Sequence, residues 1–201
     1  MIPDLSSISS ENLLPFDGET HFFSGFFQND EADQFFTKLK NQIQWKQEPI
    51  KIFGKTIMQP RLTALYGNPG KPYGYSGISM QPLVWTDFLL EIKNRVEEKA
   101  KTNFTHVLLN YYRDGKDSMG WHRDNEVVLG SNPTIASVSF GETREFHIRN
   151  YFQKKEKLKI PLDHGSLLIM SGTSQHHWEH QIPKTAKPLG ARFNLTFRKI
   201  Q

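Results

Sequence analysis

The chain has 201 residues and no cysteine, which allows one sizeable core and excludes disulfides and thiolate metal sites. Its 25 lysines and arginines exceed its 21 acidic residues, and the formal charge of +4 suits a polyanionic partner or simply a lysine-rich surface. No apolar run reaches the roughly 18 residues of a membrane span, and the start of the chain lacks a secretory pattern. We therefore expect an intracellular monomer without membrane contact, cytoplasmic in a bacterium or nuclear in a eukaryote.

A single domain is expected over residues 1–201, beginning with a polar surface arm at 1–15. Apolar residues repeated every three or four positions predict two amphipathic helices, the first capped near Asn29 and the second starting near Thr86. Between them, the segment at about 45–80 is dense in glycine, proline and aromatic residues. That composition predicts loops and hairpins.

The second half of the chain changes to short runs of the kind that form strands. These runs are 104–112, 134–140, 145–149, 158–162, 166–170 and 192–198. Several short strands in succession predict an all-β sandwich or barrel for this half. The expected fold class is therefore α+β and mostly β.

The strongest local feature for chemistry is the run His122-Arg123-Asp124. Residues two apart on an extended chain project to the same side, so an imidazole and a carboxylate are offered together. An HxD pair alone is a weak signal, but the run 176–180 supplies three further histidines. Two histidines and one carboxylate suit non-haem iron(II) with open positions. The spacing does not decide which of His176, His177 and His180 is the third ligand.

The last predicted strand carries polar residues on one face and apolar residues on the other. The polar residues are Arg192, Asn194, Thr196 and Arg198. If this face lines the interior, buried guanidinium groups need anionic partners, and a small dicarboxylate such as 2-oxoglutarate would serve. Asn110 and Tyr112 share one face of an earlier strand and could bind the same ligand. The alternative is an edge strand whose arginines face water.

These motifs together resemble the AlkB family in order and spacing, over about half of the chain. The matching segments are 110–112, 122–126, 135–141, 164–166, 177–180 and 192–198. The resemblance looks closest to the members that repair duplex DNA. It implies a double-stranded β-helix, or jelly roll, at about 104–201, with flanking N-terminal helices. The segment at about 45–80 would then be a lid that recognises the nucleotide.

The resemblance also implies cofactors and a reaction. His122, Asp124 and His180 would bind Fe(II). The residues that would hold 2-oxoglutarate are Asn110, Tyr112, Arg192, Asn194, Thr196 and Arg198. With O2, the implied enzyme converts 2-oxoglutarate to succinate and CO2 and hydroxylates the alkyl carbon of a damaged base. The unstable product then releases an aldehyde, which is formaldehyde for 1-methyladenine and 3-methylcytosine.

The same resemblance implies contacts with alkylated DNA, either duplex or single-stranded. Tyr75 and His122 would hold the flipped base between them. Tyr73, Asn125 and Glu126 would lie near its polar edge or the adjacent backbone. From the residues alone, however, simple packing around neighbouring glycines would explain Tyr73 and Tyr75. The run Ile52-Phe53-Gly54 resembles a wedge hairpin that fills the gap left by the extruded base, with Phe53 as the wedge.

Two departures from the family pattern affect the substrate. Asn125 stands where the family's pattern has a second acidic residue. The segment after Arg149 is shorter than the basic loop of duplex-repairing members, although Lys154, Lys155, Lys157 and Lys159 preserve its charge.

Three other functions remain open from the sequence. The same chemistry could act on RNA, protein or lipid. A zinc hydrolase is a second alternative, although the chain lacks a recognisable HExxH helix. A nucleic-acid binding module without turnover is the third.

Overall fold

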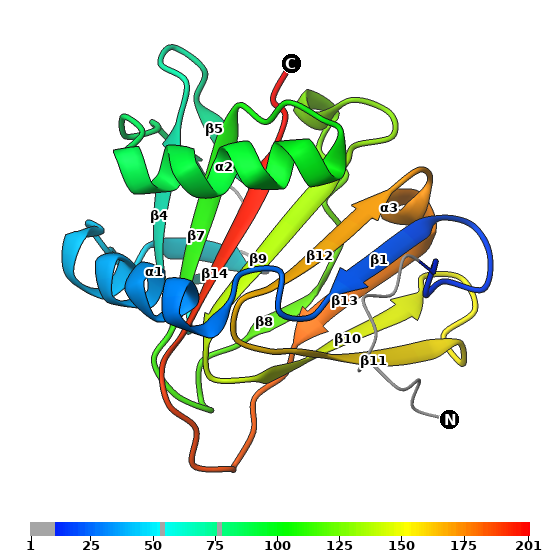
Figure 1. The fold of residues 1–201 in the computed structure, drawn as a ribbon. Helices are drawn as coiled ribbons and strands as arrows, with labels where there is room; N and C mark the ends of the chain where they lie inside the picture. The colour runs from blue at the N-terminus through cyan, green and yellow to red at the C-terminus, as the bar shows by residue number, and fades with distance from the viewer. Residues whose placement is uncertain (1–10, 53–54, 76–77) are drawn as a thin grey trace.

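The fold is described from a computed structural model that defines residues 11–52, 55–75 and 78–201. Two antiparallel sheets form its core, with six strands in the order β1-β12-β9-β14-β7-β4 and four in the order β11-β10-β13-β8 (Figure 1). The larger sheet contains β1 (Glu19–Phe23), β4 (Leu62–Gly67), β7 (His106–Tyr112), β9 (Ile135–Gly141), β12 (Ser166–Ser171) and β14 (Arg192–Arg198). The smaller sheet contains β8 (Met119–His122), β10 (Arg144–Asn150), β11 (Lys157–Leu162) and β13 (Trp178–Ile182).

Two helices, α1 (Asn29–Gln42) and α2 (Asp87–Ala100), cover one face of the larger sheet (Figure 1). Their apolar residues pack in one cluster with the apolar face of β14. The Thr86 hydroxyl caps α2 as predicted, accepting a hydrogen bond from the Leu89 N–H at 3.4 Å. The first helix differs, because Gln28 occupies the cap position and Asn29 is the first helical residue. Among the described residues, no helix is long and apolar enough to cross a membrane.

The space between the two sheets holds a second apolar cluster, to which Leu108 of β7, Phe146 of β10, Leu168 of β12 and Trp178 of β13 contribute. This two-sheet arrangement confirms the predicted mostly-β jelly roll. The polar face of β14 points into the same space, and all seven residues of the strand are buried. Because side chains alternate along β14, its apolar residues pack beneath the helices and its polar residues face the space between the two sheets.

The segment at 45–80 contains more than hairpins. It forms one hairpin from β2 (Pro49–Ile52) and β3 (Lys55–Met58) and another from β5 (Tyr73–Tyr75) and β6 (Ile78–Met80). Between them, β4 pairs with β7 and forms an edge of the larger sheet. The strand β4 therefore separates the two hairpins in the chain and belongs to the core itself. Phe53 lies outside the described residues.

Two short helices connect the remaining strands. The 3-10 helix η1 (Val127–Leu129) follows the HxD run, and α3 (Ser174–His177) leads directly into β13. The helix η1 thus lies just after the strand that carries His122, and α3 lies just before the strand that carries His180. They therefore belong to the surroundings of the site.

Candidate iron and 2-oxoglutarate site

A histidine, a carboxylate and a second histidine converge between the two sheets. His122 ends β8 and pairs in register with His180 of β13, and their ring centroids lie 4.2 Å apart. Asp124 follows two residues later, so that one ligand atom from each residue lies within 4.8 Å of the others. Among the described residues, this is the one group of three or more such side chains that could hold a metal.

The structure distinguishes between the three clustered histidines that the sequence left open. His180 lies on β13 and faces Asp124, whereas His176 and His177 belong to α3. The His176 imidazole contacts the Ser131 carbonyl and the Asn132 side chain instead. His180 is therefore the histidine that completes a facial triad with His122 and Asp124.

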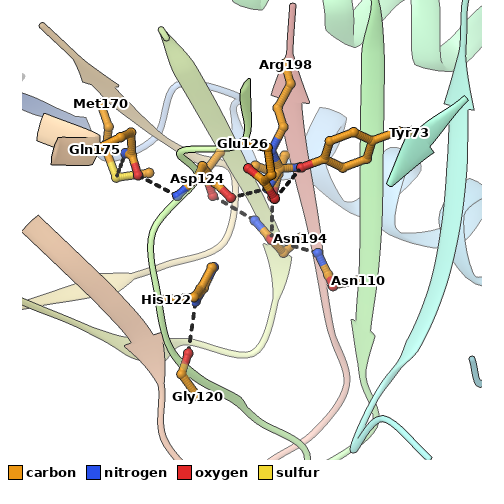
Figure 2. Close-up of polar contacts among 12 residues, drawn as sticks. Tyr73, Asn110, Gly120, His122, Asp124, Glu126, Met170, Gln175, Asn194 and Arg198 are labelled. Atoms are coloured by element: carbon orange, nitrogen blue, oxygen red, sulfur yellow. Dashed lines mark hydrogen bonds and ion pairs between the residues drawn. The ribbon is translucent and has the colours of Figure 1, made fainter. Parts of the chain in front are cut away.

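The environment keeps both imidazoles in the neutral form that binds metal. Burial, together with the neighbouring His122, lowers the pKa of His180 to about 3. Burial also lowers the pKa of His122. The His122 Nδ1 atom lies 2.9 Å from the Gly120 carbonyl, which favours a proton on Nδ1 and leaves Nε2 free (Figure 2). Opposite them, the Asp124 N–H donates to Gln175 Oε1 at 2.8 Å and fixes the backbone of the third ligand.

Arg198 forms a buried ion pair with Asp124, at 2.8 Å between Nη2 and Oδ1 (Figure 2). Burial alone would raise the pKa of Asp124, but the Arg198 guanidinium outweighs it and lowers that pKa to about 2. The second carboxylate oxygen, Oδ2, is buried and has no hydrogen-bond partner among the described residues. Asp124 is thus an ionised ligand with one oxygen available for a cation.

Replacing Arg198 with alanine is expected to lower the free energy of unfolding of the metal-free protein by about 3–5 kcal/mol, because it leaves the Asp124 carboxylate buried without a counter-charge. A bound divalent metal supplies another counter-charge, so the loss should be smaller with Mn(II) present. Urea unfolding with and without Mn(II) measures both values, and Arg198→Lys is the control that retains the charge. An equal loss in both conditions would show that the pair with Asp124 is not the cause.

At the other end of β14, Arg192 lies buried with part of its guanidinium unpartnered. Its Nη2 donates to Ser139 Oγ at 2.9 Å, while Nε and Nη1 have no hydrogen-bond partner among the described residues. Burial lowers the pKa of Arg192 to about 10, although the neighbouring Tyr112 acts in the opposite direction and raises that pKa. A buried cation with two free N–H groups is a site for a carboxylate.

Three of the four remaining predicted cofactor residues form a hydrogen-bonded row between these two arginines, and the fourth, Tyr112, lies beside Arg192. Thr196 Oγ1 donates to Asn194 Oδ1 at 3.0 Å, and Asn110 Nδ2 approaches the same oxygen at 3.4 Å. The six predicted residues line one cavity together with the triad. The structure therefore brings together every residue predicted for the metal and for 2-oxoglutarate.

Comparison with known proteins identifies the family. The profile described as the 2OG-Fe(II) oxygenase superfamily matches residues 19–198. The chain is 44% identical over 187 residues to alpha-ketoglutarate-dependent dioxygenase alkB homolog 3 of Mus musculus, covering 89% of this chain and 65% of that protein. It is 37% identical over 188 residues to DNA oxidative demethylase ALKBH2 of Homo sapiens, covering 89% of this chain and 72% of that protein. The chain belongs to the AlkB family of 2OG-Fe(II) oxygenases.

Solved structures support the fold of this AlkB-family chain. The structure of OsALKBH1 superposes with a TM-score of 0.66 at 16% identity, covering 90% of this chain and 97% of that one. An oxidoreductase of the 2OG-Fe(II) oxygenase family from Burkholderia pseudomallei gives a TM-score of 0.59 at 12% identity, with 89% and 84% covered. The chain spans slightly less than two thirds of alkB homolog 3.

The family's cofactors, Fe(II), 2-oxoglutarate and O2, fit the unsatisfied groups of the cavity. Asp124 Oδ2 is an orphaned anionic oxygen beside two neutral imidazoles, and Arg192 presents orphaned N–H groups at the far end. A hard divalent cation and a carboxylate would satisfy these two ends respectively. Both arginines of β14 keep two buried N–H-bearing nitrogens without a hydrogen-bond partner among the described residues. Arg198 already has the Asp124 carboxylate as its counter-charge, whereas Arg192 forms no ion pair within the described part of the chain, so Arg192 is the better candidate for the far carboxylate.

On the substrate side, Tyr73 and Glu126 line the cavity and Asn125 does not. The Tyr73 hydroxyl lies 3.2 Å from Glu126 Oε1, which joins the β5–β6 hairpin to the segment after the triad (Figure 2). Burial, and then the nearby Asp124, raise the pKa of Glu126. Asn125 is exposed. The side chain of Tyr75 lies outside the described residues.

One cavity residue, Arg61, was not predicted from the sequence, where its only signal is weak. Arg61, immediately before β4, is 3% exposed and donates through Nε to Asn110 Oδ1 at 2.8 Å. It also donates through Nη1 to the Ser118 carbonyl at 3.3 Å. An arginine directly before an apolar run gives a weak hint of burial, but its partner on β7 is set by the pairing of two strands. Arg61 therefore positions Asn110, one of the predicted cofactor residues.

Proposed function

We propose that the chain removes alkyl groups oxidatively from N-alkylated bases of DNA, with 1-methyladenine and 3-methylcytosine as substrates. 2-Oxoglutarate and O2 are consumed, and succinate, CO2 and formaldehyde are released. The observation that carries the proposal is a single cavity holding the His122-Asp124-His180 triad, the unsatisfied Arg192 and the Tyr73–Glu126 pair. The names of the relatives, a DNA oxidative demethylase among them, support the same reaction.

In this proposal each end of the cavity has its own role. His122, Asp124 and His180 hold the iron, and Arg192 receives the far carboxylate of 2-oxoglutarate, with Asn110, Tyr112, Asn194 and Thr196 lining the cavity between them. When bound, the iron and 2-oxoglutarate supply the oxidising power that hydroxylates a carbon attached to the base nitrogen. Arg198 holds Asp124 ionised and in place.

The wall formed by Tyr73 and Glu126 suits a methylated base. 1-Methyladenine and 3-methylcytosine carry a positive charge and present an exocyclic amino group. Glu126 Oε2 is buried and has no hydrogen-bond partner among the described residues. It can therefore accept a hydrogen bond from the exocyclic amino group of the base. A base must leave the helix to reach this position, and methylation lowers that cost by blocking its pairing. We propose that Glu126, rather than the exposed Asn125, contacts the base.

The test is anaerobic reconstitution with Fe(II) and 2-oxoglutarate, followed by O2 and oligonucleotides that carry one 1-methyladenine or 3-methylcytosine. Mass spectrometry of the base, together with succinate and formaldehyde assays, gives three independent readouts. DNA and RNA strands of the same sequence separate the main proposal from an RNA substrate. Succinate formation without any demethylation would retain the dioxygenase chemistry and contradict the proposed substrate.

Phe53 is expected to act on duplex substrates selectively, because a wedge compensates for lost stacking only where a stack is interrupted. Phe53→Ala should lower kcat/KM for a methylated duplex by at least about ten-fold, because ten-fold is about 1.4 kcal/mol and unstacking one step costs a few kcal/mol. The same methylated strand without its complement should be demethylated at the wild-type rate. Equal losses on both substrates would indicate damage to folding or a different contact.

A further inference from the structure

An aromatic and cationic surface extends outward from the mouth of the cavity to the tip of the β10–β11 hairpin, which contacts α3. Figure 1 shows the course of this hairpin. We define the surface by its members, which are Arg123, Tyr151, Phe152, Lys154 and His177. Phe152 is 69% exposed and Tyr151 is 38% exposed, the two most exposed aromatic side chains of the described residues. Their rings meet edge to face at 5.2 Å, and Phe152 lies 5.9 Å from the His177 ring. Exposed rings grouped in this way require a physical explanation.

The hairpin tip is held in place by its own hydrogen bonds. Asn150 is 2% exposed, and its Oδ1 accepts from the Phe152 and Gln153 N–H groups at 3.0 and 2.7 Å. The Tyr151 N–H donates to the His177 carbonyl at 2.6 Å, which joins the tip to α3. Because the backbone is satisfied in this way, the exposure of the rings is a fixed property of the turn and requires no rearrangement before binding.

Arg123 joins this surface to the cavity. It lies between the metal ligands His122 and Asp124 in the chain and lines the cavity. Its guanidinium lies over the Tyr151 ring at 4.0 Å and donates to the His176 carbonyl at 2.8 Å. Among the described residues, Arg123 forms no ion pair, so its charge is uncompensated. The surface therefore begins at the mouth of the site and extends outward.

The charge of the surface is positive. Lys154 Nζ lies 4.6 Å from the centroid of the Tyr151 ring and forms an ion pair with Glu179 at 2.6 Å. Arg149 shares that carboxylate at 2.6 Å. Asp17 lies 3.8 Å from His177 Nδ1, so three cations (Arg123, Arg149 and Lys154) face two acids, Glu179 and Asp17. Flat rings that alternate with cations, next to a cavity for a base, match the surfaces that bind single-stranded nucleic acid by stacking and by charge.

We infer that this surface binds an unpaired nucleotide next to the damaged base, with the base stacked on Phe152 and its phosphate near Arg123. A base inside a duplex is already stacked on both faces and cannot use the ring, so the surface favours single-stranded substrates. This inference rests on the proposed function, because it assigns the substrate class of the same site. The inference gives the β10–β11 tip a role in selecting single-stranded over duplex substrates. This role does not depend on any contact with a complementary strand.

The test is fluorescence anisotropy with a labelled methylated single strand and the matching duplex, using wild-type protein, Phe152→Ala and Phe152→Trp. Phe152→Ala should weaken single-strand binding about five-fold or more, the loss expected for one stacked base, and leave duplex binding unchanged. Phe152→Trp keeps an aromatic face and should retain the wild-type affinity. The KM for the single strand should rise by the same factor at constant kcat.

Val84→Ala is the matched control, since Val84 is 81% exposed and lies before α2, away from the surface. Wild-type affinity of Phe152→Ala for the single strand would overturn the inference and point to a protein partner for these rings. Equal weakening on single strand and duplex would also overturn it. Demethylation by the wild-type enzyme is scored separately, so failure of the proposed function is recognised without reference to Phe152.

Discussion

Replacing Arg192 with methionine is expected to raise the KM for 2-oxoglutarate by at least about 100-fold, because removing one partner of a buried charge pair costs roughly 3–5 kcal/mol. The same variant should be at least as stable as the wild type without 2-oxoglutarate, since Nε and Nη1 of Arg192 are buried and unpartnered among the described residues. Thermal unfolding with and without 2-oxoglutarate, alongside succinate kinetics, measures both effects. The wild type should gain stability from 2-oxoglutarate and the variant should not.

Arg144 provides the matched control for this prediction. It is equally buried, at 3% exposed, but its guanidinium donates to the carbonyls of Asp114, Asp117 and Pro183 at 2.7 to 3.1 Å. Arg144→Met should therefore destabilise the protein even without 2-oxoglutarate, because three carbonyls lose their donors. If Arg192→Met were the more destabilising change in the 2-oxoglutarate-free protein, Arg192 would be a structural residue and not the carboxylate site.

Replacing His180 with alanine is expected to lower the affinity for Fe(II) or Co(II) more than about 100-fold, because loss of groups beyond the direct ligands already costs 10- to 100-fold. Succinate formation should become undetectable. Metal binding is measured by titration calorimetry and by the visible absorption of Co(II). Both readouts are independent of turnover, so a metal effect is separated from a substrate effect.

The neighbouring His176 tests the choice among the clustered histidines. It lies on α3, and its ring contacts Ser131 and Asn132 away from the triad. His176→Ala should bind metal as tightly as the wild type. Loss of metal in this variant with retention in His180→Ala would reverse the assignment.

The sequence predicted those parts of the site that depend on local geometry. Alternation along β14 placed Arg192, Asn194, Thr196 and Arg198 on one face, and the structure buries all of them. The spacing in the HxD run likewise placed His122 and Asp124 together. These features depend on the two-residue period of an extended chain, which is visible in any short window of sequence.

Features that depend on which strands are neighbours were not visible. The pairing of β4 with β7 brings Arg61 to Asn110, and no local pattern encodes that contact. The strand β1 pairs with β12 across about 150 positions of the chain, and the sequence did not indicate it. The sequence also did not show that Arg198 pairs with Asp124 while Arg192 has no carboxylate partner among the described residues. The reason is that the ion pair of Arg198 joins residues 74 positions apart.

The place of β14 in the larger sheet has a consequence for how the protein is made. It lies between β7 and β9, yet it leaves the ribosome after both of them. Until it arrives, those two strands have unpaired edges, and the apolar residues beneath α1 and α2 lack their central layer. The nascent chain is thus held open and exposed to aggregation until almost the whole domain has been synthesised. Because β14 also carries Arg192 and Arg198, completion of the sheet and formation of the cofactor site are one event.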